Sequence, residues 1–163
     1  MNKRIIAIAA LFAIAFSATA QAENRIFKAK IDAKVENVKL TNHVDEPVRV
    51  VYHVNEGNDQ ATQALRNIRN HLEADPTAKI IVVTHANGVD FLLDGAVDKN
   101  GNNFEANVQE LKGKGVDFRV CAITLKRRNI DPKKVIDEAV IVPSGVAEVA
   151  KLQFKEGYAY LRP

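Results

Sequence analysis

The sequence predicts an α/β fold: a three-layer α/β/α sandwich on a mainly parallel sheet of about five strands. Short runs rich in β-branched residues recur along the chain, as expected for strands that are buried on both faces. Segments with apolar residues at helical spacing lie between these runs. Strands that alternate with helices in this way favour a parallel sheet with right-handed crossovers.

The five strands are expected where apolar residues follow one another without helical spacing. The first two are the clearest, because their interiors are almost wholly apolar. In chain order, the predicted strands are 48–54, 79–85, 116–121, 139–142 and 158–161.

Helices are expected between the strands. The first runs from Ala61 to Leu72 and ends at Asp75, because a residue before proline avoids the helical region. Asp131 is expected to cap a helical turn that begins at the proline after it. Three further helices are predicted over 89–93, 104–112 and 122–128. A last one runs from Ser144-Gly145 to a C-terminal cap at Gly157, with four apolar residues partly buried: Val146, Val149, Leu152 and Phe154.

Residues 1–22 have the three parts of a secretory signal peptide. Lys3 and Arg4 provide the basic start, residues 5–16 the apolar run, and small residues the cleavage site. Cleavage after Ala20 is one alternative, and an uncleaved anchor is another, although the apolar run is short for a span of about 20 residues. We expect export to the periplasm or the medium, with no stable membrane insertion after cleavage.

The exported chain has nearly balanced charge. Residues 23–47 are interpreted as an N-terminal extension that could contribute one strand, and residues 48–163 as the domain. Without the signal, 21 basic residues face 20 acidic ones, a net charge of +1. The basic clusters 126–128 and 133–134 lack interleaved aromatic residues, so we interpret them as solvated helix faces and expect no nucleic-acid partner.

Cys121 is the only cysteine in the chain, so an intramolecular disulfide is impossible. It ends a predicted strand where a helix begins, and the N–H groups and dipole there favour the thiolate. A reactive Cys121 is expected to be open to solvent. The alternative is a packed core thiol, because free cysteine is readily buried.

Other polar residues gather at the predicted carboxyl ends of the strands, where open α/β sheets bind ligands. His53 is a candidate general base or hydrogen-bond donor to the sulfur. The N–H groups at Ser144 and Gly145 could bind an anion such as a persulfide. The remaining candidates for an anion or sulfur pocket are Asn55, His85, Asn87 and Gly88.

No metal or cofactor is expected. His53, His85 and Cys121 could together bind zinc or copper, but the chain lacks closely spaced ligand pairs. It also lacks the glycine-rich dinucleotide and phosphate-loop motifs and the serine hydrolase motif.

Several segments resemble the DsrE/DsrF-like sulfur-relay proteins, and the likeness extends over residues 48–163. The segments are 51–54, 64–68, 82–89, 115–121 and 142–146, with the terminal Gly157-Tyr158. One departure is Arg128-Asn129, where the family often has a basic residue and glycine; asparagine tolerates the left-handed conformation.

The resemblance implies a DsrEFH-like fold and a role for Cys121 as the cysteine that carries sulfur as a persulfide. It also implies homo-oligomers (dimers, trimers or hexamers) and thiol-bearing proteins as sulfur donors and acceptors. Such a protein would be a sulfurtransferase or sulfur carrier. The alternative is a non-catalytic binding or assembly protein of the same fold, in which the cysteine is structural.

Overall fold

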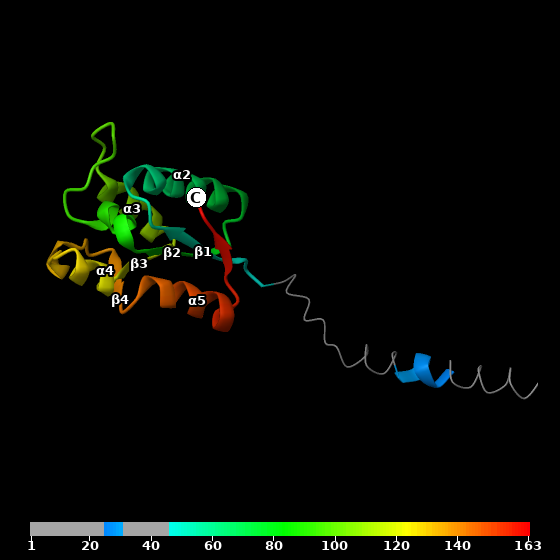
Figure 1. Ribbon diagram of the computed structural model, residues 1–163. Helices are drawn as coiled ribbons and strands as arrows, with labels where there is room; N and C mark the ends of the chain where they lie inside the picture. Colours follow the sequence, from blue (N-terminus) through cyan, green and yellow to red (C-terminus); the bar gives the residue numbers. More distant parts are fainter. Residues whose placement is uncertain (1–24, 31–45) are drawn as a thin grey trace, which may run out of the picture. The chain divides into compact units, whose positions relative to one another are not determined.

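The computed structural model describes residues 25–30 and 46–163 (Figure 1). The chain divides into two units, 1–45 and 46–163. Residues 25–30 form a helical segment rather than the strand considered for the extension. The predicted signal peptide lies outside the described residues. Within the described ranges, no helix is long and apolar enough to cross a membrane.

The second unit is built on a five-stranded sheet in which every pairing is parallel, which confirms the predicted fold class. The strand order is β4-β3-β2-β1-β5. The strands are β1 (Arg49–Val54), β2 (Lys79–Thr84), β3 (Asp117–Cys121), β4 (Ala139–Val142) and β5 (Ala159–Leu161).

Helices cover both faces of this sheet (Figure 1). The chain steps from β1 to β4 in one direction across the sheet, then returns to place β5 beside β1. The return connection is α5 (Gly145–Glu156), which packs on the face opposite α2 and α3. The other helical elements are α2 (Asn58–Ala74), η2 (Ala86–Leu92), α3 (Phe104–Gly113), α4 (Ala122–Arg127) and η3 (Pro132–Lys134).

Two apolar clusters form the core. The larger one joins the sheet to α2, η2 and α3 and contains the fully buried Phe91, Phe104 and Phe118. The smaller one lies under α5, around Val83 and Leu152. Because strand residues alternate between faces, His53, His85 and Cys121 lie on the α5 side of their strands.

The predicted helix ends are confirmed. Asp75 is the C-cap of α2, and the Asp131 side chain accepts a hydrogen bond from the Lys133 N–H at the start of η3. Gly157 ends α5 with φ 71°, and Asn129 after α4 has φ 53°. Asparagine thus takes the left-handed conformation that the family often gives to glycine.

One expectation for α5 is wrong. Val149 and Leu152 are buried, but Val146 and Phe154 are 62% and 91% exposed. Phe154 follows Leu152 by two residues, about 200° around the helix, so the two side chains point in nearly opposite directions. Four apolar residues therefore do not form one buried face.

Candidate functional site

The chain changes direction at the carboxyl ends of β3 and β4. The chain leaves β3 into α4 and leaves β4 into α5, which pack on different faces of the sheet. Such a change of direction opens the crevice in which α/β proteins bind ligands. Cys121 is the last residue of β3 and the N-cap of α4, and Gly145 is the first residue of α5.

Hydrogen-bond donors surround the Cys121 sulfur. The groups that act on its pKa are the Gly145 N–H, the Thr124 hydroxyl and the N–H groups of Thr124 and Ile123, although the Cys121 side chain makes no capping hydrogen bond at the start of α4. Burial raises the pKa of the Cys121 thiol. These donors lower it by more, so the net pKa lies below its ordinary value. The thiolate therefore forms more readily here than in an ordinary cysteine.

The expectation that the sulfur is open to solvent is wrong. Cys121 is only 4% exposed, because it lies beneath the first turns of α4 and α5. Polar donors nevertheless act on the sulfur and lower the pKa of the thiol. This environment differs from that of an ordinary core thiol, which has no need of hydrogen bonds.

Gly145 makes this close packing possible. A Cβ atom at this position would lie 2.9 Å from the Thr84 carbonyl oxygen and 3.2 Å from the Cβ atoms of both Cys121 and His85. Only a residue without a side chain fits there, and its N–H thereby reaches the sulfur. The same contacts show that His85 stands beside Cys121 on the neighbouring strand.

The rings of the two histidines lie against each other, tilted by 37°. The ring centroids of His53 and His85 are 4.7 Å apart, and His53 Nδ1 lies 2.8 Å from the Tyr160 hydroxyl oxygen. Burial lowers the pKa of both rings, and the charges of His85 and Arg162 lower that of His53 further. Both imidazoles are therefore neutral at neutral pH, and His85, rather than His53, is the one next to the cysteine.

The remaining candidates lie around this centre. Ser144 accepts a hydrogen bond from the Ala147 N–H, so its hydroxyl serves as a helix cap. Gly88 packs against β1, since a Cβ there would lie 2.1 Å from the Val54 carbonyl oxygen. Asn55 adjoins that contact, and its Oδ1 is buried without a hydrogen-bond partner among the described residues. None of these three residues is among the groups that lower the pKa of the Cys121 thiol.

A cavity of about 420 Å³ opens between α4 and the residues that follow β2, and Cys121 does not line it. Arg128 donates to the Ala86 carbonyl oxygen at 3.0 Å and pairs with Asp90 at 2.7 Å. Arg127 has no hydrogen bond or ion pair within the described part of the chain. The lining residues are His85, Ala86, Asn87, Thr124, Arg127 and Arg128.

The interpretation of 126–128 as a solvated helix face missed this cavity, and Thr124 was not a candidate at all. Thr124, Arg127 and Arg128 are spaced at i, i+3 and i+4, which places them on one face of α4. This spacing, next to a cysteine at the end of a strand, is the sequence signal that could have identified these residues as part of the site.

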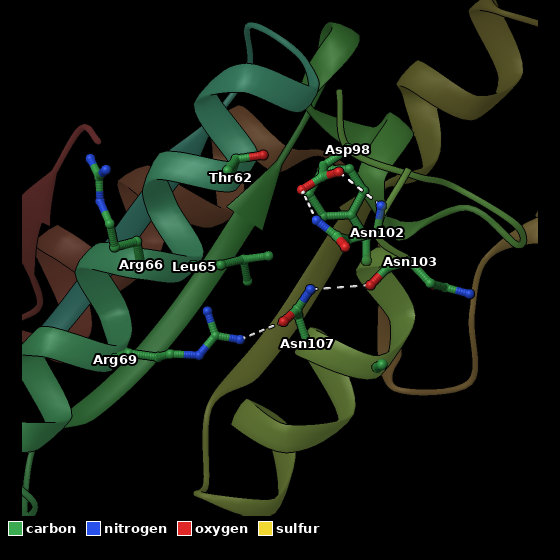
Figure 2. A pocket seen from close by; sticks show the side chains of 10 residues that line it. Thr62, Leu65, Arg66, Arg69, Asp98, Asn102, Asn103 and Asn107 are labelled. Carbon is green, nitrogen blue, oxygen red and sulfur yellow. Dashed lines mark hydrogen bonds between the residues drawn. The ribbon is translucent and has the colours of Figure 1, made fainter. Parts of the chain in front are cut away.

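A second cavity, of about 470 Å³, lies between α2 and α3 (Figure 2). Its polar side chains largely satisfy one another: Arg69 Nη2 donates to Asn107 Oδ1 at 2.7 Å, and Asp98 accepts from Asn102. None of the candidate site residues lines it. We therefore place the site at Cys121.

Metal ligands are not grouped in this structure. Over residues 25–30 and 46–163, no three histidine, cysteine, aspartate or glutamate side chains are arranged to hold an ion. The combination of His53, His85 and Cys121 is thus not such a group.

Fold and site together define a parallel α/β domain with a buried cysteine at the carboxyl edge of its sheet. The chain belongs to the DsrE/DsrF-like family, whose sequence pattern it matches over residues 48–163. No curated protein sequence matches it.

Two solved structures are similar. A protein of unknown function from Methanobacterium thermoautotrophicum, MTH1491, is 30% identical, with a TM-score of 0.62. The match covers 71% of this chain and 99% of that one. The ychN protein from E. coli has the same fold, with 17% identity, a TM-score of 0.60 and coverage of 71% and 99%.

Proposed function

We propose that this protein carries sulfane sulfur as a persulfide on Cys121. The observation that supports the proposal most is the set of donors around the sulfur, from Gly145, Thr124 and Ile123. Hydrogen bonds to an anion stabilise it most when the surroundings exclude water, as they do here. A buried thiolate and a buried persulfide anion would both be stabilised in this way.

The proposed transfer is a displacement at sulfur. The Cys121 thiolate attacks the terminal sulfur of a donor persulfide, R–S–SH. A bond forms between Sγ and that sulfur, the donor's S–S bond breaks, and the donor leaves as R–S⁻. The product is Cys121–S–SH, and no net oxidation occurs. Release to an acceptor thiolate reverses these steps.

His85 is the residue best placed to manage the proton. The Cβ atoms of His85 and Cys121 both lie against Gly145, and the His85 ring is neutral, so it is our candidate to accept the thiol proton before attack. The His53 ring lies against this ring and supports it, and Tyr160 in turn holds His53. We therefore assign the proton transfer to His85 and a positioning role to His53.

Intact-mass measurement of the purified protein tests the proposal. After anaerobic incubation with inorganic polysulfide, the wild type should gain whole sulfur atoms, while the Cys121→Ser variant should gain none. A wild-type protein that gains no sulfur, although iodoacetamide alkylates Cys121, would contradict it.

The alternative is a binding or assembly protein with a structural cysteine. The 4% exposure of Cys121 is the observation in its favour. If this alternative holds, the Cys121 thiol should resist alkylation in the folded protein, and Cys121→Ser should change only the packing around the residue.

We further propose that the protein is exported and cleaved after residue 22. The sequence pattern of residues 1–22 supports this. The mass of the protein recovered outside the cytoplasm should correspond to a chain that begins at Glu23. A full-length mass there would show instead that the segment is kept as an anchor.

A further inference from the structure

The cavity between α4 and the residues that follow β2 has the size of a small-molecule site. Its volume of about 420 Å³ falls within the range of roughly 300–1,000 Å³ that is usual for ligand pockets. Five of its six lining residues carry polar or charged side chains, so a polar ligand fits it better than an apolar one.

Thr124 connects this cavity to the sulfur. Cys121 itself does not line the cavity, but the Thr124 side chain does, and its hydroxyl is one of the groups that lower the pKa of the Cys121 thiol. The same oxygen accepts a hydrogen bond from the Ala86 N–H at 3.1 Å, which holds the side chain in place. A molecule in the cavity is therefore one side chain away from the sulfur, with His85 on the same wall.

The cavity carries uncompensated positive charge. No acidic residue lines it, and the nearby Asp90 is paired with Arg128. Burial lowers the pKa of His85, so this ring is neutral at neutral pH. Arg127 is exposed and has no partner in the described chain, which leaves its guanidinium free to bind an anion.

We infer that this cavity binds a small anionic sulfane-sulfur compound, with Arg127 selecting anionic donors over neutral or cationic ones. The inference rests on the proposed role of Cys121 as sulfur acceptor and adds the class of donor. Thiosulfate is the simplest member of that class. Its oxygen atoms match the guanidinium, which binds oxyanions through two parallel N–H groups.

The transfer from thiosulfate balances. The Cys121 thiolate attacks the outer sulfur of thiosulfate, a bond forms between Sγ and that sulfur, and the S–S bond of thiosulfate breaks. Sulfite leaves with the bonding electron pair. The cysteine becomes a persulfide anion, total charge is conserved, and no other oxidant or reductant is needed.

Two methanethiosulfonate reagents test the charge preference directly. The sulfonatoethyl reagent is anionic and the trimethylammonioethyl reagent is cationic, and both form a mixed disulfide with a thiolate while methanesulfinate leaves. The measured quantity is the ratio of the two rates at Cys121. It is compared among the wild type, Arg127→Ala and Lys126→Ala, which removes a neighbouring charge that does not line the cavity.

We expect the anionic-to-cationic rate ratio to fall about tenfold in Arg127→Ala, since a unit charge at contact distance is worth on the order of 1 kcal/mol even in water. Lys126→Ala should leave the ratio nearly unchanged. A ratio that is equal in all three proteins would overturn the inference, as would a folded wild type that reacts with neither reagent.

A second measurement separates this inference from the proposed function. The wild type and Arg127→Ala are incubated with thiosulfate or with neutral dimethyl trisulfide, and the mass added to Cys121 is followed. Thiosulfate adds one sulfur atom as sulfite leaves, and dimethyl trisulfide adds a methylthio group as methyl persulfide leaves. Loss of loading with thiosulfate alone supports the inference. Equal loading of both proteins by both donors overturns it while preserving the carrier function, and no loading from any donor contradicts the carrier function itself.

Discussion

Two opposing effects meet at the Cys121 sulfur. Burial at 4% exposure disfavours the charged form, and hydrogen bonds from Gly145, Thr124 and Ile123 favour it. The hydrogen bonds prevail, so the pKa of the thiol is lowered. The reactivity of this residue therefore depends on a few donors at fixed positions, each of which can be removed singly.

The Thr124 hydroxyl is the side-chain donor among them. In Thr124→Val, the pKa of the Cys121 thiol should rise, because the hydroxyl hydrogen bond to the sulfur is lost. Thr124→Ser keeps the hydroxyl and should leave the pKa close to that of the wild type. Titration of the thiolate ultraviolet absorbance measures both. An unchanged pKa in the valine variant would show that the backbone N–H groups suffice.

The two adjacent histidines make stability depend on pH. Their pKa values are lowered in the folded state, so the unfolded chain binds more protons as the pH falls below about 6.5. Their contribution to the free energy of unfolding is complete above that pH and decreases below it. Urea denaturation should show a smaller loss between neutral and mildly acidic pH in His53→Gln than in the wild type. An equal loss of stability in both proteins would show that His53 does not contribute to this pH dependence.

Among the elements, α5 decides the geometry of the site. Arg119 on β3 pairs with Glu148 on α5 and with Asp117, which ties the first turns of the helix to the sheet. Burial lowers the pKa of Arg119, but the two carboxylates raise it by more. The guanidinium of Arg119 therefore stays protonated. The helix start, and with it the Gly145 N–H, is thereby held over the cysteine.

Glycine substitutions test how closely α5 approaches. Gly145→Ala should lower the free energy of unfolding by about 1–3 kcal/mol, because the new methyl group overlaps Thr84, Cys121 and His85. It should also raise the pKa of the thiol as the Gly145 N–H moves away.

Gly113→Ala is the matched control, because nothing lies within 4 Å of a Cβ at the end of α3. This variant should stay within about 1 kcal/mol of the wild type. If the two variants had equal free energies of unfolding in urea, α5 would be able to move away from the sheet without loss of stability.

At the scale of the whole molecule, the two faces of the sheet are covered unequally. Several elements cover one face, while α5 packs on the other and buries a smaller cluster. Large apolar side chains remain exposed on this side and at both sheet edges: Val140, Val146, Phe154, Tyr160 and Leu161. Exposed apolar groups of this kind favour association, and we therefore propose that the protein forms the homo-oligomer that the family resemblance implies.

Phe154 provides the test of that association. Because it is 91% exposed, Phe154→Ser should leave the thermal stability of a single chain nearly unchanged. It should shift the molar mass measured by light scattering toward the monomer. Gln153→Ser, an exposed polar neighbour, should shift nothing. A wild-type protein that is monomeric at all concentrations would contradict the proposed homo-oligomer.

The order of the elements could be predicted from the sequence alone, because apolar periodicity and end signals act over a few residues. Asp75, Asp131 and Gly157 mark helix ends in the sequence and in the structure. The parallel sheet follows from the alternation of strands and helices. The position of Cys121 at a strand end is equally local.

Only the tertiary structure decided which of these residues meet. The strand order places His85, and not His53, beside Cys121, while the contacts of Gly145 bring α5 over the sulfur. Thr124 and Arg127 belong to the site because one face of α4 lies against the cavity beside the start of η2. Contacts between residues far apart in sequence depend on how whole elements pack, and no local pattern encodes that packing.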